Sequence, residues 1–315
     1  MVKNIKSDDF KPIDITLQDD ACHLKQGFGR IETWYYDAIF ENNYSIVTII
    51  NILHIGRFGL VLTGLFIYKD SKPIKIIRKR YPLSDFFGDE DKPLIKIREK
   101  EFLKGYINDE NNWITHIHID EDEIKIDLDF IKKSKGFKGK TYLGKWLVIP
   151  KMVVSGEINL GSKKIEVKGL GYHDHNIYPI YAPFKTKGYY FGKLDIDTNN
   201  NITWARVIKN RNKQQLLAIL SKDGEYYNIP NKSINYEILN QVKDHKKIMP
   251  TRCSLNINSD IIKLKLNIET INYHYIGILV ANYWRYHVRY QGEIEIDSKI
   301  KQIDNIEITE YLKFF

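Results

Sequence analysis

Short apolar runs that alternate with polar residues dominate the chain and predict antiparallel β-strands. From Trp113 to Ile119, and again from Glu123 to Phe130, apolar residues alternate with polar or charged ones. A period of two is typical of a strand with one buried face and one wet face. Comparable runs, separated by turn-forming Gly, Asn, Asp and Pro residues, recur along most of the 315 residues. We therefore expect an all-β protein.

The number of candidate strands, about sixteen or more, exceeds what one small barrel holds. Two consecutive antiparallel β-barrels of about eight strands each match this number better. The boundary is expected between residues 165 and 185. We place an N-terminal barrel, preceded by an arm, at 1–170 and a C-terminal barrel at 171–315. No amphipathic helix longer than two turns is convincing, and residues 234–243 are the one candidate helix.

Charge and cysteine content argue against several classes of protein. The net charge is +8, but the lysines are spread along the chain and many have acidic neighbours, so no nucleic-acid-binding stripe is expected. Cys22 and Cys253 are too few for a disulfide framework and are expected to be buried thiols. The N-terminus shows no apolar signal core, and Asn51 and Arg57 interrupt the most apolar window, residues 44–68. We expect a soluble cytoplasmic protein.

One stretch concentrates the reactive side chains, namely Gly-Leu-Gly-Tyr-His-Asp-His-Asn at residues 169–176. Its two glycines allow a bend or a close backbone approach. In a strand, Tyr172 and Asp174 would point to one face, and His173 and His175 to the other. The sequence contains no Gly-x-Ser-x-Gly elbow, phosphate-binding loop or cysteine cluster, so hydrolase, nucleotide-dependent and redox chemistry lack support.

Several motifs, in order along nearly the whole chain, resemble the lipocalin-like family of hydroxyneurosporene synthase (carotenoid 1,2-hydratase). The most specific are Glu-Thr-Trp-Tyr-Tyr-Asp at residues 32–37 and the central Gly-x-Gly-Tyr-x-Asp-His-Asn motif. Weaker matches are Asp-Asp-Ala-Cys-His at 19–23, Trp146 with Pro150 and Gly156-Glu157-Ile158, residues 190–194 with Trp204-Ala205-Arg206, residues 283–286, and Glu310-Tyr311-Leu312. The resemblance implies two consecutive lipocalin-like (calycin) barrels. Two positions differ from the family pattern: Gly144 replaces a histidine of the hydratases, and Ile177 replaces the tryptophan after the motif.

Hydration or cyclisation of an isoprenoid begins with protonation of a carbon atom, which needs an acid that stays protonated near neutral pH. A carboxyl group buried among apolar side chains meets that need, because desolvation disfavours its ionised form. Asp174 is the candidate acid, and Tyr172 would share its cavity and orient it. Further candidate ligand contacts are a histidine, an amide and four rings that could stabilise a cation: His175, Asn176, Trp34, Trp146, Trp204 and Trp284.

These residues also have structural interpretations. Asp174 and Asn176 could cap a turn, and buried tryptophans are more often core residues than ligand contacts. His173 is expected to be a hydrogen-bonded structural histidine, with His175 beside it. No third ligand is evident near this pair, so no metal is predicted. Supporting roles fall to acids that hold the first strand and to arginines that could pair with them: Glu32, Asp37, Arg206 and Arg285.

The favoured function is a cofactor-independent hydratase/lyase or cyclase-isomerase that acts on an apolar isoprenoid or polyene-like substrate by acid catalysis. The alternative is a non-enzymatic lipocalin-type protein that binds a hydrophobic small molecule. The missing histidine near Trp146 favours the alternative, and the retained Tyr172-x-Asp174 favours the enzyme. A structural module would be the third interpretation if side chains fill both barrels. The expected partner is a hydrophobic small molecule, with access from a membrane as an option, no cofactor and no nucleic acid.

Overall fold

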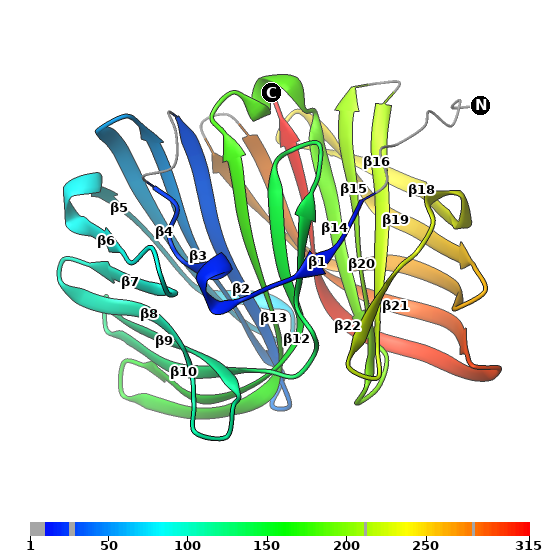
Figure 1. Cartoon of the computed structure of the whole chain (residues 1–315), viewed down its shortest axis with the longest axis horizontal. Coiled ribbons are helices and arrows are strands. Elements are labelled where there is room, and N and C mark those ends of the chain that lie inside the picture. Colours follow the sequence, from blue (N-terminus) through cyan, green and yellow to red (C-terminus); the bar gives the residue numbers. More distant parts are fainter. Residues whose placement is uncertain (1–9, 25–28, 211–212, 279–280) are drawn as a thin grey trace. The chain divides into compact units, whose positions relative to one another are not determined.

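Antiparallel strands make up almost all of the computed structural model, which describes residues 10–24, 29–210, 213–278 and 281–315 (Figure 1). Two curled sheets form two lipocalin-like barrels, so the all-β, two-barrel fold predicted from the sequence is confirmed. The N-terminal barrel comprises Pro12–Lys140 and Gly144–Ala182, and the C-terminal barrel comprises Pro183–Phe315 with Thr141–Leu143 and residues 10–11.

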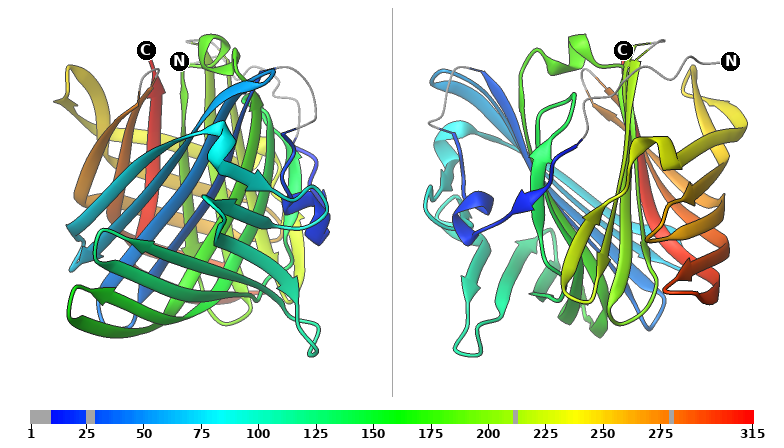
Figure 2. Two further views of the ribbon diagram at one scale, coloured as in Figure 1. Left: turned by 90° about the vertical axis from the view of Figure 1, so that its left-hand side faces the viewer. Right: turned by 45° about the vertical axis from the view of Figure 1, so that its right-hand side comes forward.

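Among the described residues, the sheet of the N-terminal barrel has the spatial order β5-β4-β3-β2-β13-β12-β10-β9-β8-β7-β6, with β11 on β12 and β1 on β11. Figure 2 shows its long strands, blue to green, curving around one interior. The strands are β1 Ile13–Asp14, β2 Arg30–Phe40, β3 Tyr44–Ile55, β4 Phe58–Lys69, β5 Lys72–Pro82, β6 Phe86–Gly88, β7 Leu94–Ile97, β8 Lys100–Ile107, β9 Trp113–Glu121, β10 Ile124–Lys132, β11 Phe137–Lys140, β12 Lys145–Leu160 and β13 Lys163–Pro179. Two 3-10 turns, η1 Leu17–Asp20 and η2 Leu83–Asp85, connect them.

Strands β2 and β13, the first long strand and the last strand of this barrel, lie side by side. The two glycines of the central motif permit this approach. A Cβ on Gly169 would lie 2.0 Å from the backbone oxygen of Ile39, and one on Gly171 would lie 2.7 Å from that of Asp37. The close backbone approach expected for these glycines is therefore present, and it sets His173 and its neighbours directly opposite β2.

The C-terminal barrel repeats this closure, because its first strand β14 pairs with its last strand β22. The spatial order is β17-β16-β15-β14-β22-β21-β20-β19-β18. The elements are α1 Ala182–Lys185, β14 Gly188–Asp195, β15 Asn200–Asn210, β16 Lys213–Lys222, β17 Glu225–Asn228, η3 Asn231–Ser233, β18 Ile234–Asp244, β19 Lys247–Asn258, β20 Lys263–Ile278, β21 Ala281–Ile296 and β22 Lys299–Phe314. The division of the chain into the two units falls within the short helix α1, between Ala182 and Pro183.

Each barrel has its own apolar core, filled by the inward-facing residues that alternate along its strands. In β10, the core receives Ile124, Ile126, Leu128 and Phe130, while the residues between them are not fully buried. This is the arrangement that strict alternation predicts. Both cysteines are buried free thiols, as expected. No helix among the described residues is long and apolar enough to cross a membrane.

Two expectations from the sequence differ from the structure. Residues 234–243, expected to be helical, form strand β18, so that prediction is wrong. The spacing of Ile234 and Ile238 resembles a helical face, but pairing with β19 along the whole strand satisfies the backbone groups that a helix would otherwise satisfy. The second difference concerns the cut at residue 170: β13 runs through it without a break, and the compact units divide after Ala182, within the expected range of 165–185.

Candidate functional site

The two histidines of the central motif face the core of the N-terminal barrel. His173 stacks on Tyr36, with ring centroids 4.0 Å apart, and His175 stacks on Trp34 at 4.3 Å. Tyr36 and Trp34 are both members of the apolar core. The stacking follows from register, because each histidine on β13 lies directly opposite its aromatic partner on β2.

Two buried carboxylates link these histidines into a continuous chain. The Oδ1 atom of Asp20 lies 2.9 Å from Nε2 of His173 and 3.1 Å from Nδ1 of His175. On the other side of His175, its Nε2 atom lies 2.9 Å from Oε1 of Glu32. The same oxygen lies 3.1 Å from Nδ1 of His23, the only partly exposed member of the chain. The order is therefore His173–Asp20–His175–Glu32–His23, from the interior outward.

Electrostatics favour the protonated form of His175 near neutral pH. Burial alone would lower its pKa, but the hydrogen bonds and charges of Asp20 and Glu32 outweigh burial and raise the pKa to about 9. Burial acts in the opposite direction on Asp20, whose pKa His173 and His175 hold at about 2. The pKa of Glu32 is also lowered, against the effect of its burial, by His175 and His23. The charged imidazole of His175 pairs with the carboxylates of Asp20 and Glu32, and each of these three ions would be unfavourable in the core without its partners.

Two groups of side chains have the composition and spacing of metal ligands. His23, Glu32 and His175 offer one ligand atom each within 4.8 Å of one another, and an outer group consists of His116, His118 and Asp127. In the first group hydrogen bonds already occupy the facing atoms, and Glu32 also accepts the backbone N–H of His23. The atoms that could bind a metal are thus the same ones that hydrogen-bond to one another.

The opposite face of β13 carries a second polar cluster, which we call the Tyr–Asp square. Tyr172 donates its hydroxyl hydrogen to Oδ2 of Asp174 at 2.9 Å, and on β2 Tyr35 donates to Oδ2 of Asp37 at 3.0 Å. The strands run antiparallel, so Tyr172 lies opposite Asp37 and Asp174 lies opposite Tyr35. All four residues are buried. Two carboxyls and two phenols thus occupy the corners of one patch.

Two further donors fix the carboxylate of Asp174. The indole of Trp146 donates to Oδ2 at 3.2 Å, and the amide of Asn176 donates to Oδ1 at 2.7 Å. Indole and amide N–H groups can only donate, so among these partners only the hydroxyl oxygen of Tyr172 can accept a hydrogen bond from protonated Asp174. Phe137 packs edge-on against Trp146 at 6.0 Å, which adds a second ring beside the square.

The sequence pattern correctly places Tyr172 with Asp174 on one face of β13 and His173 with His175 on the other. The prediction of which face carries the buried histidines was the wrong way round. We expected Tyr172 and Asp174 to face a ligand cavity and the histidines to turn away from it. In the structure the histidines face the interior, where Trp34 and Tyr36 cover them. Alternation shows which residues share a face, but it does not show which face is inside. Interior placement of His175 depends on the carboxylates of Asp20 and Glu32, which lie far away in sequence.

The four candidate tryptophans occupy different environments and do not line one pocket. Trp34 stacks on His175 in the N-terminal core and donates to the backbone oxygen of Asp20. Only Trp146 contacts Asp174. Trp204 and Trp284 belong to the core of the C-terminal barrel, where Trp284 donates to Asp244.

The supporting residues have partners that the sequence did not identify. Glu32 holds His23 and His175, and Asp37 accepts from Tyr35. Both arginines contact side chains of the C-terminal barrel. Arg206 donates to Gln214 at 2.9 Å, and Arg285 donates to the Tyr283 hydroxyl at 3.0 Å and lies 4.0 Å from Glu310.

Sequence reasoning did not assign roles to Asp20, His23 or Tyr35. A signal for Tyr35 was present, because the pattern Tyr-x-Asp occurs both at 35–37 and at 172–174. Two such patterns on neighbouring antiparallel strands produce the square. Asp20 ends the 3-10 turn η1 and His23 follows it, and the polar character of this segment gave no indication of burial.

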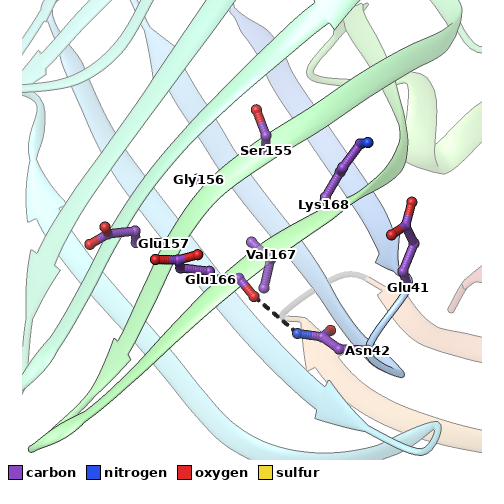
Figure 3. Close-up of a pocket in the computed structure, with 8 residues that line it drawn as sticks. All are labelled: Glu41, Asn42, Ser155, Gly156, Glu157, Glu166, Val167 and Lys168. Carbon is purple, nitrogen blue, oxygen red and sulfur yellow. Dashed lines mark hydrogen bonds between the residues drawn. The ribbon is translucent and has the colours of Figure 1, made fainter.

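A separate hollow lies at the far end of β13, where Asn42 donates to the backbone oxygen of Glu166 at 3.1 Å (Figure 3). It is lined by Glu41, Asn42, Ser155, Gly156, Glu157, Glu166, Val167 and Lys168. Lys168 precedes His173 by five positions, which in a strand corresponds to about 17 Å. The hollow therefore belongs neither to the histidine chain nor to the Tyr–Asp square.

Comparisons with known proteins identify solved structures of the same fold. Neither a family model nor a curated protein sequence matches the chain. A protein described as AttH from Nitrosomonas europaea has a TM-score of 0.69 at 13% identity, covering 93% of this chain and 94% of its own. Kievitone hydratase from Nectria haematococca has a TM-score of 0.62 at 11% identity, covering 96% and 93%. CghA bound to Sch210972 has a TM-score of 0.59 at 10% identity, covering 91% and 89%. These likenesses show the two-barrel, lipocalin-like fold.

Proposed function

We propose that the chain is an acid–base catalyst that needs no cofactor and hydrates, isomerises or cyclises an apolar isoprenoid or polyene-like molecule. The observation that carries the proposal is the Tyr–Asp square: a buried carboxyl, Asp174, bonded to a phenol and an indole and placed beside a second phenol–carboxyl pair. Two buried carboxyls on one patch disfavour double ionisation, because like charges repel. We propose that this repulsion outweighs the three donors that favour ionised Asp174 and keeps one proton on the pair near neutral pH, the proton that carbon protonation requires.

The reaction balances with this one proton. Asp174 donates it to one carbon of a double bond, and the neighbouring carbon becomes a cation. We propose that the neighbouring rings of Tyr172, Trp146 and Phe137 stabilise that charge. Water then adds and returns a proton to the carboxylate, giving hydration. Loss of a proton from carbon to the same carboxylate instead gives isomerisation or, after ring closure, cyclisation.

Two lines of reasoning support this assignment. The motifs around Trp146, Tyr172 and Asp174 resemble those of hydroxyneurosporene synthase, and the residues of these motifs converge in the structure. Kievitone hydratase, named for its own hydration reaction, shares the fold. The missing histidine has a local structural reason. A Cβ on Gly144 would lie 2.3 Å from the backbone oxygen of Ile177, so no side chain fits there without a backbone shift.

Gly144 also supports the second candidate function, a binding protein that holds an apolar molecule without converting it. A carrier needs no proton donor, so the absence of the histidine has no consequence for it. The two functions differ in one observable: only the enzyme forms a new bond between carbon and solvent hydrogen.

The test is incubation of the purified protein with squalene, geranylgeraniol and neurosporene in D₂O, followed by mass spectrometry. The enzyme is expected to add water or to return an isomer, with deuterium bound to carbon. Asp174→Asn should lower the rate by about 10²-fold or more, the range of general acid catalysis, while Tyr172→Phe should have a smaller effect. Asp129→Asn on the outer face of β10 is the matched control and should react like the wild type. Retention of an unchanged probe would establish the carrier, and full activity of Asp174→Asn would exclude the proposed acid.

A further inference from the structure

Two imidazoles and two carboxylates meet on the outer face of strands β9 and β10. His116 and His118 flank the core residue Ile117, so their side chains point away from the core of the N-terminal barrel. Asp127 and Asp129 occupy the corresponding outward positions on β10. The register sets His118 opposite Asp127 and His116 opposite Asp129. Two neighbouring strands therefore place four ionisable side chains on a single patch, each about one-third to one-half exposed.

The imidazole of His116 is held so that one of its nitrogens faces Asp127. Its Nδ1 atom lies 2.8 Å from Oδ1 of Asp129. A carboxylate beside one nitrogen of a neutral imidazole keeps the proton on that nitrogen, which leaves a lone pair on the other. That other nitrogen, Nε2, lies 3.9 Å from Oδ1 of Asp127, beyond hydrogen-bond distance. His116 thus has the arrangement of a metal-binding histidine, whose far nitrogen is usually bonded to a carboxylate or a carbonyl.

Three ligand atoms of the outer group lie around one point. His116, His118 and Asp127 each offer one, and the three atoms lie within 4.8 Å of one another. Bonds of about 2.0–2.2 Å to a tetrahedral Zn²⁺ ion place its ligand atoms about 3.4 Å apart. From Oδ1 of Asp127, the distances are 3.9 Å to Nε2 of His116 and 2.5 Å to Nδ1 of His118. These distances lie on either side of the required one, so rotations of partly exposed side chains can bring all three atoms to an ion while the strands stay in place.

The charges on the neighbouring strands favour a cation at the same place. Asp127 lies opposite Glu157 on β12, and Glu157 lies opposite Glu166 on β13, where both glutamates line the hollow of Figure 3. Like charges directly opposite one another in a sheet are unfavourable. Two lysines offset part of this repulsion, since Lys125 lies 3.4 Å from Asp127 and Lys164 lies 2.5 Å from Glu157. A divalent cation at the histidine end of this row of carboxylates would offset more of it.

We propose that the outer group binds a Zn²⁺ ion through Nε2 of His116, Nδ1 of His118 and Oδ1 of Asp127. Two imidazoles and one carboxylate form a common three-ligand set for Zn²⁺, with water in the fourth position. Mg²⁺ and Ca²⁺ prefer oxygen ligands, so the two imidazoles select against these ions. The site lies on other strands than the Tyr–Asp square and does not depend on the proposed reaction.

Calorimetric titration of the metal-free protein, prepared without a histidine tag, with ZnCl₂ tests the proposal. The wild type is expected to bind Zn²⁺ at this group, and His116→Gln and His118→Gln should each weaken binding by at least about tenfold, because even the loss of a hydrogen-bond partner of a metal ligand costs about 10- to 100-fold. His245→Gln is the matched control, since His245 is an exposed histidine that pairs with a carboxylate, Asp244, at 2.9 Å outside both metal-like groups. It should bind Zn²⁺ as the wild type does, and so should His23→Gln, which removes a histidine of the inner group.

Two further measurements keep the outcome independent of folding and of the proposed reaction. In the unaltered protein, Co²⁺ should give the intense visible absorption of a tetrahedral site, and excess Mg²⁺ should not displace it. Asp174→Asn should bind Zn²⁺ normally even if it loses all activity. A wild type without this absorption, or displacement of Co²⁺ by Mg²⁺, would overturn the proposal. So would wild-type affinity for Zn²⁺ in either His116→Gln or His118→Gln.

Discussion

His175 shows at the scale of one residue how this barrel tolerates charge in its core. Its imidazole lies between the carboxylates of Asp20 and Glu32, and all three side chains are fully buried. None of them would be stable there alone, because an unpaired ion in a core is strongly unfavourable. The three charges are therefore mutually dependent, and His173 and His23 each add a contact to one of the two carboxylates.

Replacing His175 should destabilise the N-terminal barrel strongly. His175→Gln leaves Asp20 and Glu32 without the cation between them, and breaking a buried pair in this way typically costs about 3–5 kcal/mol. His118→Gln is the control, since His118 pairs with Asp127 at a site that is one-third exposed and should cost at most about 1 kcal/mol. Urea unfolding measures both. Equal losses for the two variants would contradict the account of the buried chain.

Strand β13 illustrates at the scale of one element what sequence can and cannot specify. Its alternation correctly places Tyr172 with Asp174 and His173 with His175, because a strand's geometry is local. The inward orientation of the histidines depends on Asp20 and Glu32, which no local pattern reveals. Strand β18 shows the reverse limit, since its weak helical spacing was overridden by pairing with β19. Periodicity was reliable where the alternation was strict, as in β10.

The glycines of β13 should be sensitive to the smallest substitution. Gly169→Ala would place a Cβ 2.0 Å from the backbone oxygen of Ile39, and the two strands would have to separate. Overpacking of this kind costs about 1–3 kcal/mol, and we expect the upper end because the obstacle is backbone. In Gly277→Ala on β20, the nearest atom is the movable hydroxyl of Tyr275 at 3.3 Å, so the change should be below about 1 kcal/mol. Thermal unfolding of the two variants provides the comparison, and a Gly169→Ala variant as stable as the wild type would show that the strands can move apart.

At the scale of the whole molecule, the chain consists of two units that each pair their first long strand with their last strand. Strand number and turn spacing were sufficient to predict this architecture. Strand number and turn spacing did not predict which polar and aromatic side chains meet inside each barrel. Which buried rings and charges meet depends on register between strands far apart in sequence, as for Tyr190 and Tyr311.

The two barrels should lose stability at opposite ends of the pH range. The pKa of His175 is raised from 6.5 to about 9, so its contribution is complete below pH 6.5 and is lost as pH rises through 9. Burial, together with the charges of Arg285 and Lys193, lowers the pKa of His287 in the C-terminal barrel to about 4. Its contribution is present above pH 6.5 and is lost as pH falls toward 4. Each shift corresponds to about 3 kcal/mol.

Limited proteolysis followed by mass spectrometry locates these losses. New cleavage should appear within residues 12–182 between pH 7 and 9, and within residues 183–315 between pH 6 and 4. His175→Gln should abolish the alkaline change, and His287→Gln should weaken the acid one. Cleavage that begins in the C-terminal barrel at alkaline pH would contradict the assignment of these two histidines.

The central claim is that the Tyr–Asp square holds a carboxyl proton near neutral pH. Infrared spectroscopy tests it without knowledge of the substrate, because a protonated carboxyl has a carbonyl stretch distinct from that of a carboxylate. The account predicts such a band at pH 7 in the wild type, shifted in D₂O and absent from Asp174→Asn. Asp37→Asn should also lack it, since removing either carboxyl removes the repulsion that retains the proton. Asp129→Asn should keep the band. A wild-type spectrum without this band, or a band that survives both Asp174→Asn and Asp37→Asn, would contradict the claim.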